Sequence, residues 1–203
     1  MSKRLILIGA SGHGKVIADI AKKNGYTEIA FLDDNAETVS CAKYSVLGKS
    51  DRATDFPDCD FIVSVGNAAV RKRLQEQLER NGLSVVSLVH PNAVVASGAV
   101  IGKGTVVMAG AVINPDAKIG DGCIINTCSS VDHDCTVGDY VHVAVGAHVA
   151  GSVTIGSNTW IGAGATVINN IKIANDCMIG AGAVVVKDIT EAGTYKGVPA
   201  RRD

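Results

Sequence analysis

A six-residue repeat occupies the C-terminal half of this chain and restricts what that half can fold into. From Ala93 to Asp188 the sequence divides into sixteen consecutive hexads without an insertion or deletion. The third residue of every hexad is Val or Ile, from Val95 to Val185, and the first is mostly small. One aliphatic residue in every six indicates a short strand and a tight turn per hexad. Three such strands close a triangular coil, and stacked coils bury a continuous aliphatic core. We therefore expect a parallel β-helix in which residues 18 positions apart stack on neighbouring coils.

The first ninety residues show a different pattern, in which strands alternate with helices. Apolar runs predict four strands, over residues 5–8, 28–32, 60–65 and 84–89. Helices are expected over residues 15–24 and from an N-cap at Asn67 to Arg80. This alternation predicts a small α/β domain of Rossmann-like type with a parallel sheet. The pattern changes near His90-Pro91, so we predict an α/β domain over 1–89 and a β-helix domain with a C-terminal tail over 90–203.

Charge and composition argue against several classes of partner. The chain has 19 basic and 20 acidic residues, so it lacks the electrostatic footprint of a protein that binds nucleic acid or an anionic membrane surface. No apolar run approaches the roughly 18 residues that a membrane-spanning helix needs. The six cysteines form no C-x-x-C pair and no zinc-like spacing. We expect a cytoplasmic protein with reduced thiols, no nucleic-acid partner and no membrane insertion.

A glycine-rich turn, Gly9-Ala-Ser-Gly-His-Gly14, follows the first predicted strand and opens a helix. In that context glycines let backbone N–H groups and the helix N-terminus approach a phosphate. The acidic pair Asp33-Asp34 ends the next strand, where hydroxyl and N–H donors of a ribose or base would bind. The spacing G-x-x-G-x-G differs from the dinucleotide fingerprint, so a nucleotide is favoured over NAD. The alternative is structural: the glycines shape a tight turn and the acidic pair lies in a solvated loop.

In the predicted solenoid, the polar residues that interrupt the aliphatic pattern cluster at one level: Asn126, His133, Asp134 and His142. The stacking of residues 18 positions apart places Gly151 directly over His133. This brings a backbone N–H without a shielding side chain next to a candidate general base, as an acyl-transfer site needs. The Asp134 carboxylate could hydrogen-bond the imidazole and raise its basicity. The alternative is a histidine that is merely solvated on a turn.

Two further features concern coenzyme A. A column of short residues, Thr127, Val145, Ala163 and Ala181, could hold an extended pantetheine arm, although small residues at a turn also suit the fold itself. In the tail, Lys196, Arg201 and Arg202 could meet the phosphates of the coenzyme or form an ordinary solvated terminus.

The histidines do not suggest a metal centre. His142 and His148 occupy the second position of successive hexads, so they face different sides of the triangle and cannot share an ion within one chain. We predict no metal site.

Several motifs occur together and in order along the chain. They are Gly9-Ala-Ser-Gly-His-Gly14, Phe-Leu-Asp33-Asp34, Val-Gly66-Asn67, Val-Asp-His133-Asp134-Cys, His142-Val-Ala-Val-Gly-Ala and Gly-Val-Pro-Ala-Arg-Arg. With this set the whole chain resembles the bacterial nucleotide-aminosugar N-acetyltransferases of the bacillosamine pathway, which are hexapeptide-repeat acyltransferases grouped with the sialic-acid O-acetyltransferase-like proteins. The resemblance implies a left-handed β-helix, acetyl-CoA as co-substrate without a metal, and a homotrimer with active sites between adjacent subunits.

The resemblance also implies roles for individual residues. His133 would be the general base and Asp134, at a position where relatives often have Glu, its partner. His142 would meet the acetyl or thioester end of acetyl-CoA, Gly151 would donate its N–H to the developing oxyanion, and Ala163 and Ala181 would line the coenzyme. The residues implied in binding the UDP-sugar substrate are Ser11, Gly12, His13, Asp33, Asp34 and Gly66, and we add Asn126 as a candidate substrate contact.

We therefore expect acetyl-CoA-dependent N-acetylation of the C4 amine of a UDP-linked 4-amino-4,6-dideoxy sugar, by direct transfer with a histidine base. Two enzymatic alternatives use the same base: O-acetylation of sialic acid or another sugar hydroxyl, and N-acetylation of a GDP- or dTDP-linked aminosugar. An alternative of another class is an inactive nucleotide-binding sensor or scaffold.

Overall fold

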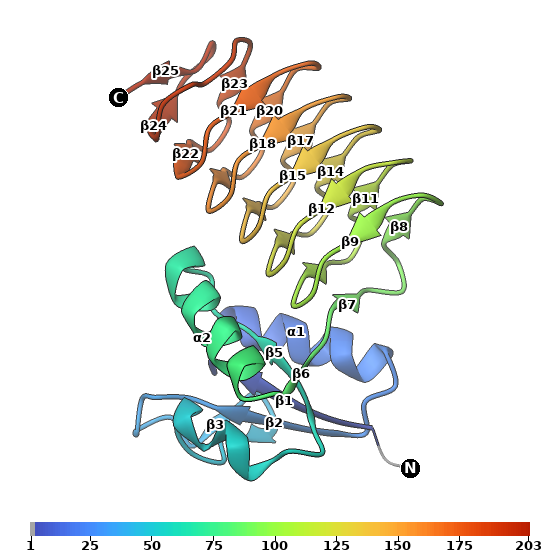
Figure 1. The fold of residues 1–203 in the computed structure, drawn as a ribbon, viewed down its shortest axis with the longest axis vertical. Coiled ribbons are helices and arrows are strands. Elements are labelled where there is room, and N and C mark those ends of the chain that lie inside the picture. The colour runs from blue at the N-terminus through green and yellow to red at the C-terminus, as the bar shows by residue number, and fades with distance from the viewer. Residues whose placement is uncertain (1–2) are drawn as a thin grey trace. The chain divides into compact units, whose positions relative to one another are not determined.

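The computed structural model describes residues 3–203, which form two compact units that divide between Pro91 and Asn92 (Figure 1). Each unit has its own core, and each is described by itself below. No helix within residues 3–203 is long and apolar enough to cross a membrane.

The first unit is built on a four-stranded parallel sheet in the order β2-β1-β5-β6. Its elements along the chain are β1 (Arg4–Ile8), α1 (Gly12–Lys23), β2 (Glu28–Leu32), β3 (Ser40–Cys41), β4 (Tyr44–Ser45), the 3-10 helix η1 (Ser50–Asp55), β5 (Asp60–Val63), α2 (Ala68–Arg80), β6 (Ser84–Val85) and β7 (Leu88–Val89). The predicted parallel α/β fold is confirmed. Parallel strands end together, so the turns after β1, β2 and β5 lie at one edge of the sheet.

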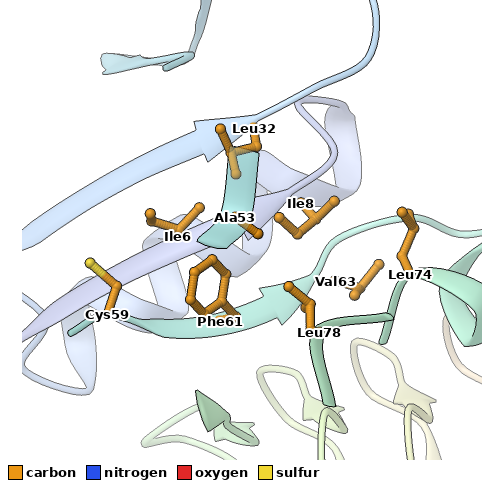
Figure 2. Packing of buried hydrophobic residues seen from close by; sticks show 9 residues of the cluster. All are labelled: Ile6, Ile8, Leu32, Ala53, Cys59, Phe61, Val63, Leu74 and Leu78. Carbon is orange, nitrogen blue, oxygen red and sulfur yellow. The ribbon is translucent and has the colours of Figure 1, made fainter. Parts of the chain in front are cut away.

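After a polar first residue, each strand of this sheet is apolar because both faces of the sheet are covered. On one face the cluster drawn in Figure 2 packs against α2 and η1: Ile6, Ile8, Leu32, Ala53, Cys59, Phe61, Val63, Leu74 and Leu78. The alternate residues Leu5, Leu7 and Phe31 are equally buried on the opposite face. There, a Cβ at Gly14 of α1 would lie 2.9 Å from the Phe31 ring, so this position needs glycine.

Three sequence predictions for this unit need correction. The helix α1 begins at Gly12, three residues before the predicted start, and β5 ends at Val63 rather than residue 65. The strand ends early because the Ser64 hydroxyl donates to the carbonyls of Ile8 and Gly9. The predicted strand over 84–89 is two short strands, β6 and β7. The β3–β4 hairpin and η1 were not predicted, because their sequences show no hydrophobic periodicity.

The second unit is a solenoid of three ladders, here called faces I, II and III, in which the strands pair in parallel except for the antiparallel pair β24–β25 at the C-terminal end. Face I contains β10 (Val106–Val107), β13 (Ile124–Ile125), β16 (His142–Val143), β19 (Trp160–Ile161), β22 (Cys177–Ile179), β24 (Gly193–Lys196) and β25 (Arg201–Arg202). Face II contains β8 (Val94–Val95), β11 (Val112–Ile113), β14 (Ser130–Val131), β17 (His148–Val149), β20 (Thr166–Val167) and β23 (Val184–Val185). Face III contains β9 (Val100–Ile101), β12 (Lys118–Ile119), β15 (Thr136–Val137), β18 (Thr154–Ile155) and β21 (Lys172–Ile173). The predicted β-helix is confirmed, with one short strand for each hexad.

The hexad pattern has a direct physical cause. The third residue of each hexad points into the solenoid, so Val107, Ile125 and Val143 are fully buried. Strands 18 residues apart pair in register, as Ile124 does with His142. The sixth residue of most hexads adopts a positive φ, and where it is not glycine, as at Asp134 (φ 58°), the turn holds a side chain in the left-handed region.

Candidate active site

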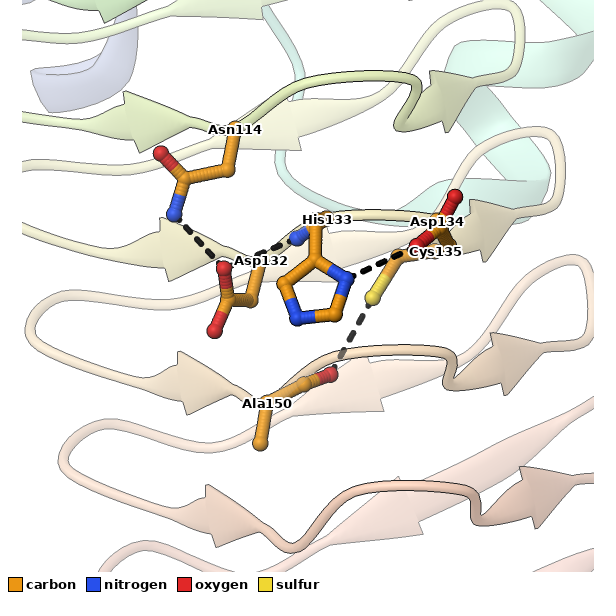
Figure 3. Close-up of polar contacts among 6 residues, drawn as sticks. All are labelled: Asn114, Asp132, His133, Asp134, Cys135 and Ala150. Atoms are coloured by element: carbon orange, nitrogen blue, oxygen red, sulfur yellow. Dashed lines mark hydrogen bonds and ion pairs between the residues drawn. The ribbon is translucent and has the colours of Figure 1, made fainter.

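His133 lies on the turn between β14 and β15, at the edge where face II meets face III (Figure 3). Its Nδ1 lies 2.8 Å from Asp134 Oδ2. The left-handed conformation of Asp134 lets the short aspartate side chain reach the imidazole of the residue before it. With Nδ1 donating to the carboxylate, Nε2 of a neutral ring is the proton acceptor.

The electrostatic environment of His133 favours its protonated form. The hydrogen bond that the imidazole donates to Asp134, followed by the charge of Asp132, raises the pKa of His133 above its usual value. The side chain is 55% exposed, so it is accessible to a substrate. A histidine in this setting is a stronger base than an isolated one.

A further pair of residues holds this turn in place, and the sequence analysis did not identify it. Asp132 Oδ1 accepts hydrogen bonds from the His133 N–H at 2.8 Å and from Asn114 Nδ2, one coil away, at 2.7 Å. Both bonds lower the pKa of the Asp132 carboxyl, so it remains charged near the imidazole. An amide and a carboxylate 18 positions apart were the signal that could have revealed this pair.

Gly151 stacks on His133, as the repeat predicts. A Cβ at Gly151 would lie 2.6 Å from His133 Nε2, so only glycine leaves the imidazole in its position. In several other hexads a side-chain acceptor binds the N–H at this turn position, as Asp132 does for His133. Residue 150 is alanine, and within residues 3–203 the Gly151 N–H has no hydrogen-bond acceptor. A backbone donor beside the basic nitrogen is suited to stabilising an oxyanion.

His142 belongs to a second group, at the edge where face I meets face II. Asn126 Oδ1 accepts from the Thr127 N–H at 2.8 Å, which orients the amide so that Nδ2 lies 3.0 Å from His142 Nε2. Because Nε2 is therefore an acceptor, Nδ1 of the neutral ring carries the hydrogen. The ring is 8% exposed and packs against Trp160, with centroids 4.3 Å apart. His142 is thus held as a hydrogen-bond donor.

The predicted column of short residues lies at this same edge. The N–H of Gly164 donates to the Val145 carbonyl, and the N–H of Gly182 donates to the Ala163 carbonyl, so Val145, Ala163 and Ala181 stack in register. Within the described residues, the N–H groups of Ala163 and Ala181 also have no acceptor.

The His133 group and the His142 group do not meet within one chain. Residues 127 and 133 lie at opposite ends of one side of the triangle, which at strand spacing corresponds to on the order of 15–20 Å. The structure therefore brings together His133, Asp134 and Gly151 at one edge, and Asn126, His142, Ala163 and Ala181 at the other.

In the first unit the glycine-rich turn and the acidic pair are linked. Asp33 Oδ2 accepts from the Ala10 N–H at 2.6 Å, and Asp33 Oδ1 accepts from the Asn35 N–H. Asp34 Oδ1 accepts from the N–H and hydroxyl of Ser50, and these bonds lower the pKa of Asp34. Both carboxylates thus brace local loops and have limited capacity for a ligand.

His13 lies in the first turn of α1. Burial, followed by the charge of Arg71, lowers its pKa to about 4, so the ring is neutral at physiological pH. Its Nε2 is buried and has no hydrogen-bond partner within residues 3–203. Ser11, Gly12 and Gly66 occupy adjoining turns at the carboxyl edge of the sheet, and a Cβ at Gly12 or Gly66 would meet no atom within 4 Å.

Arg71 is a second residue that sequence reasoning missed. This side chain is 1% exposed, and its Nη1 donates to the carbonyls of Val65 at 3.0 Å and Gly66 at 2.7 Å. These two hydrogen bonds fix the backbone of the turn at Gly66. Its position next to Val70 and one turn before Gln75, on the side of the predicted helix that packs against the sheet, gave little signal.

No group of three or more His, Cys, Asp or Glu side chains within residues 3–203 could hold a metal ion. In the tail, Lys196 pairs with Asp203 and Arg202 pairs with Glu191, while Arg201 is exposed.

Comparisons with known proteins connect both units to one family. The PglD N-terminal domain matches residues 4–78, and the bacterial transferase hexapeptide family matches residues 152–187. The acetyltransferase domain of PglB from Neisseria gonorrhoeae FA1090, solved with acetyl coenzyme A, is 38% identical, with full coverage of both chains and a TM-score of 0.96. PerB from Caulobacter crescentus, solved with CoA and GDP-perosamine, is 34% identical over 98% of this chain and 97% of that one, with a TM-score of 0.94.

A curated relative adds a named reaction. The UDP-N-acetylbacillosamine N-acetyltransferase of Bacillus subtilis (strain 168) is 40% identical over 112 residues, which is 53% of this chain and 52% of that protein. The match thus spans about half the length of that relative. Since the similarity to the solved structures covers both units at 34–38% identity, the chain belongs to the family of hexapeptide-repeat nucleotide-aminosugar N-acetyltransferases with a PglD-type N-terminal domain.

Proposed function

We propose that this protein transfers an acetyl group from acetyl-CoA to the C4 amine of a UDP-linked 4-amino-4,6-dideoxy sugar. The observation that supports this most directly is the arrangement of His133, Asp134 and Gly151. It combines a basic nitrogen, a carboxylate that raises its basicity and an unused backbone donor at one exposed edge.

The reaction follows from this geometry. His133 Nε2 accepts a proton from the substrate amine as the amine nitrogen attacks the thioester carbonyl. The new C–N bond places negative charge on the former carbonyl oxygen, to which the Gly151 N–H donates. When the C–S bond breaks, the CoA sulfur leaves and takes up the proton held by His133. No covalent enzyme intermediate is needed.

The second edge is suited to the donor. His142, oriented by Asn126 with its hydrogen on Nδ1, would donate to the thioester end of acetyl-CoA. The unoccupied N–H groups of Ala163 and Ala181 would face the amides of the pantetheine arm. The structures of PglB with acetyl coenzyme A and of PerB with CoA support a coenzyme site in this fold.

The first unit is suited to the nucleotide of the acceptor. Ser11, Gly12, His13 and Gly66 surround a helix N-terminus, which attracts phosphate. Asp33 and Asp34 would brace this region, with their remaining lone pairs available to base or ribose donors. Asn126 would act through His142.

We further propose a homotrimer. The two edges that hold the His133 and His142 groups are separated within one chain, so a complete site needs the first edge of one copy and the second edge of another. This gives one active site for each of three interfaces. All six cysteines are free thiols, in keeping with a cytoplasmic enzyme.

A free-thiol assay with acetyl-CoA and a panel of acceptors tests the proposal. CoA release with a UDP-4-amino-4,6-dideoxy sugar supports it. Release with a GDP-linked aminosugar alone would favour the second candidate, which the likeness to PerB makes specific. Release with free sialic acid alone would indicate O-acetylation, and absence of release with every acceptor would reject an acetyltransferase.

A further inference from the structure

The first turn of α1, which follows the glycine-rich turn after β1, contains a lysine that the proposed function leaves without a role. Gly9, Gly14 and Lys15 have the spacing G-x-x-x-x-G-K, which occurs in phosphate-binding loops between a strand and a helix. In those loops the next residue is Ser or Thr, whose hydroxyl binds Mg²⁺. Here it is Val16, so this turn would bind phosphate without a metal.

The geometry directs Lys15 towards the open end of the helix. The helix α1 begins at Gly12, and the Lys15 N–H donates to the Ser11 carbonyl at 3.0 Å, which places Lys15 one turn into the helix. Helical side chains lean towards the N-terminus, so the lysine stem runs back towards Gly12. The space above Gly12 is open, because a Cβ there would meet no atom within 4 Å.

The β3–β4 hairpin lies beside the glycine-rich turn. Cys41 Sγ donates to the Ser11 carbonyl at 3.5 Å. Burial raises the pKa of this thiol, and the nearby charge of Lys15 acts in the opposite direction. The charge of Lys15 therefore lies close to the glycine-rich turn.

Lys15 is an exposed cation beside the glycine-rich turn. Within residues 3–203, Lys15 forms no ion pair. His13 is neutral at physiological pH, so it cannot supply positive charge. The Arg71 guanidinium is buried and donates to two backbone carbonyls. Asp33, the nearby anion, already accepts two backbone hydrogen bonds.

We propose that Lys15 binds the pyrophosphate of the acceptor nucleotide and thereby selects nucleoside diphosphates over nucleosides, without a divalent cation. This inference rests on the proposed nucleotide-sugar site and assigns its specificity to one residue.

Isothermal titration calorimetry on the full-length protein tests it, with UDP, GDP and uridine as probes and EDTA present. Lys15→Met keeps the length of the side chain and removes its charge. We expect it to weaken binding of whichever diphosphate the wild type prefers by roughly 10- to 100-fold, since a charge-assisted hydrogen bond is lost. Uridine binding should be unchanged. Lys22→Met, near the other end of α1, is the matched control and should bind as the wild type does.

Several outcomes would overturn the inference: wild-type affinity of Lys15→Met for the diphosphate, an equal loss of uridine binding, loss of diphosphate binding in EDTA, or no diphosphate binding by the wild type. Because this measurement involves no acetyl transfer, it is separable from the proposed reaction. A protein that binds UDP through Lys15 but releases no CoA would reject the reaction and retain the role of Lys15.

Discussion

The two units of this protein place functional groups in different ways. In the solenoid every hexad repeats one local structure, so a residue that departs from the repeat, such as His133, has a reason other than folding. In the α/β unit each element is used once, and the candidate site consists largely of backbone groups at turns such as Gly9–Gly14. In the solenoid, candidate functional residues can be recognised in the sequence because they depart from the repeat. In the α/β unit, they can be recognised only from their arrangement in the structure.

The difference has an energetic side. His133 is exposed on a turn, so it can be replaced without disturbing the buried third-position residues such as Val131. In the α/β unit, Asp33 and Arg71 hold the turns through hydrogen bonds, so binding and local stability depend on the same contacts. The comparison predicts that substitution of His133 in the solenoid changes the catalytic rate without changing stability, whereas substitution of Asp33 in the α/β unit changes the affinity for the acceptor.

The largest effect is expected for His133→Ala. Loss of the base should lower kcat by about 10²–10⁴-fold, with an unchanged thermal unfolding midpoint because the side chain is exposed. His148→Ala is a matched control, since His148 is also an exposed solenoid histidine, hydrogen-bonded to Ser130. Steady-state CoA release and circular dichroism provide the measurements. Near-normal turnover of His133→Ala would refute its role as base.

Gly151→Ala comes next. The added methyl group would displace the imidazole, and we expect kcat to fall by roughly 10²–10³-fold, the effect of disturbing an oxyanion donor. In a His133→Ala background the methyl group has no ring to displace, so a double-mutant cycle should show a much smaller further loss. Full additivity would indicate that Gly151 acts independently of His133.

In the α/β unit, Asp33→Ala should act on the acceptor. Removal of the carboxylate that holds the Ala10 N–H loosens the glycine-rich turn, and we expect KM for the nucleotide-sugar to rise about tenfold. KM for acetyl-CoA should stay the same. Asp19→Ala, on the exposed side of α1, is the control. An equal rise in both KM values would contradict the assignment of acceptor binding to the α/β unit alone.

The smallest effect concerns pH. His133 must be neutral to accept a proton, so kcat/KM should rise with pH through its pKa. Asp134 raises that pKa, and Asp134→Asn should therefore shift the rising limb to lower pH while reducing the maximum rate by about threefold to tenfold. A pH–rate profile of CoA release measures both changes. An unshifted limb would mean that Asp134 does not tune the base.

Sequence reasoning succeeded where a local rule governs the structure. The hexads place a strand at every predicted position because the buried third residue and the turn are set within six residues. The N-cap at Asn67, which accepts from the Val70 N–H, follows from local propensity in the same way. The misplaced boundaries in the α/β unit, such as the early end of β5, arise from the Ser64 hydroxyl bonding to another strand. Such a contact has no local signature.

By itself, the sequence determined the register of the solenoid, the parallel α/β unit and the stacking of Gly151 on His133, because each follows from a fixed spacing. Only the tertiary structure decided that Asn114 and Asp132 support the His133 turn, that Asn126 sets the tautomer of His142, and that His13 is neutral. These properties depend on hydrogen bonds and desolvation among residues from different coils or strands. They exist only once the chain has brought those residues together.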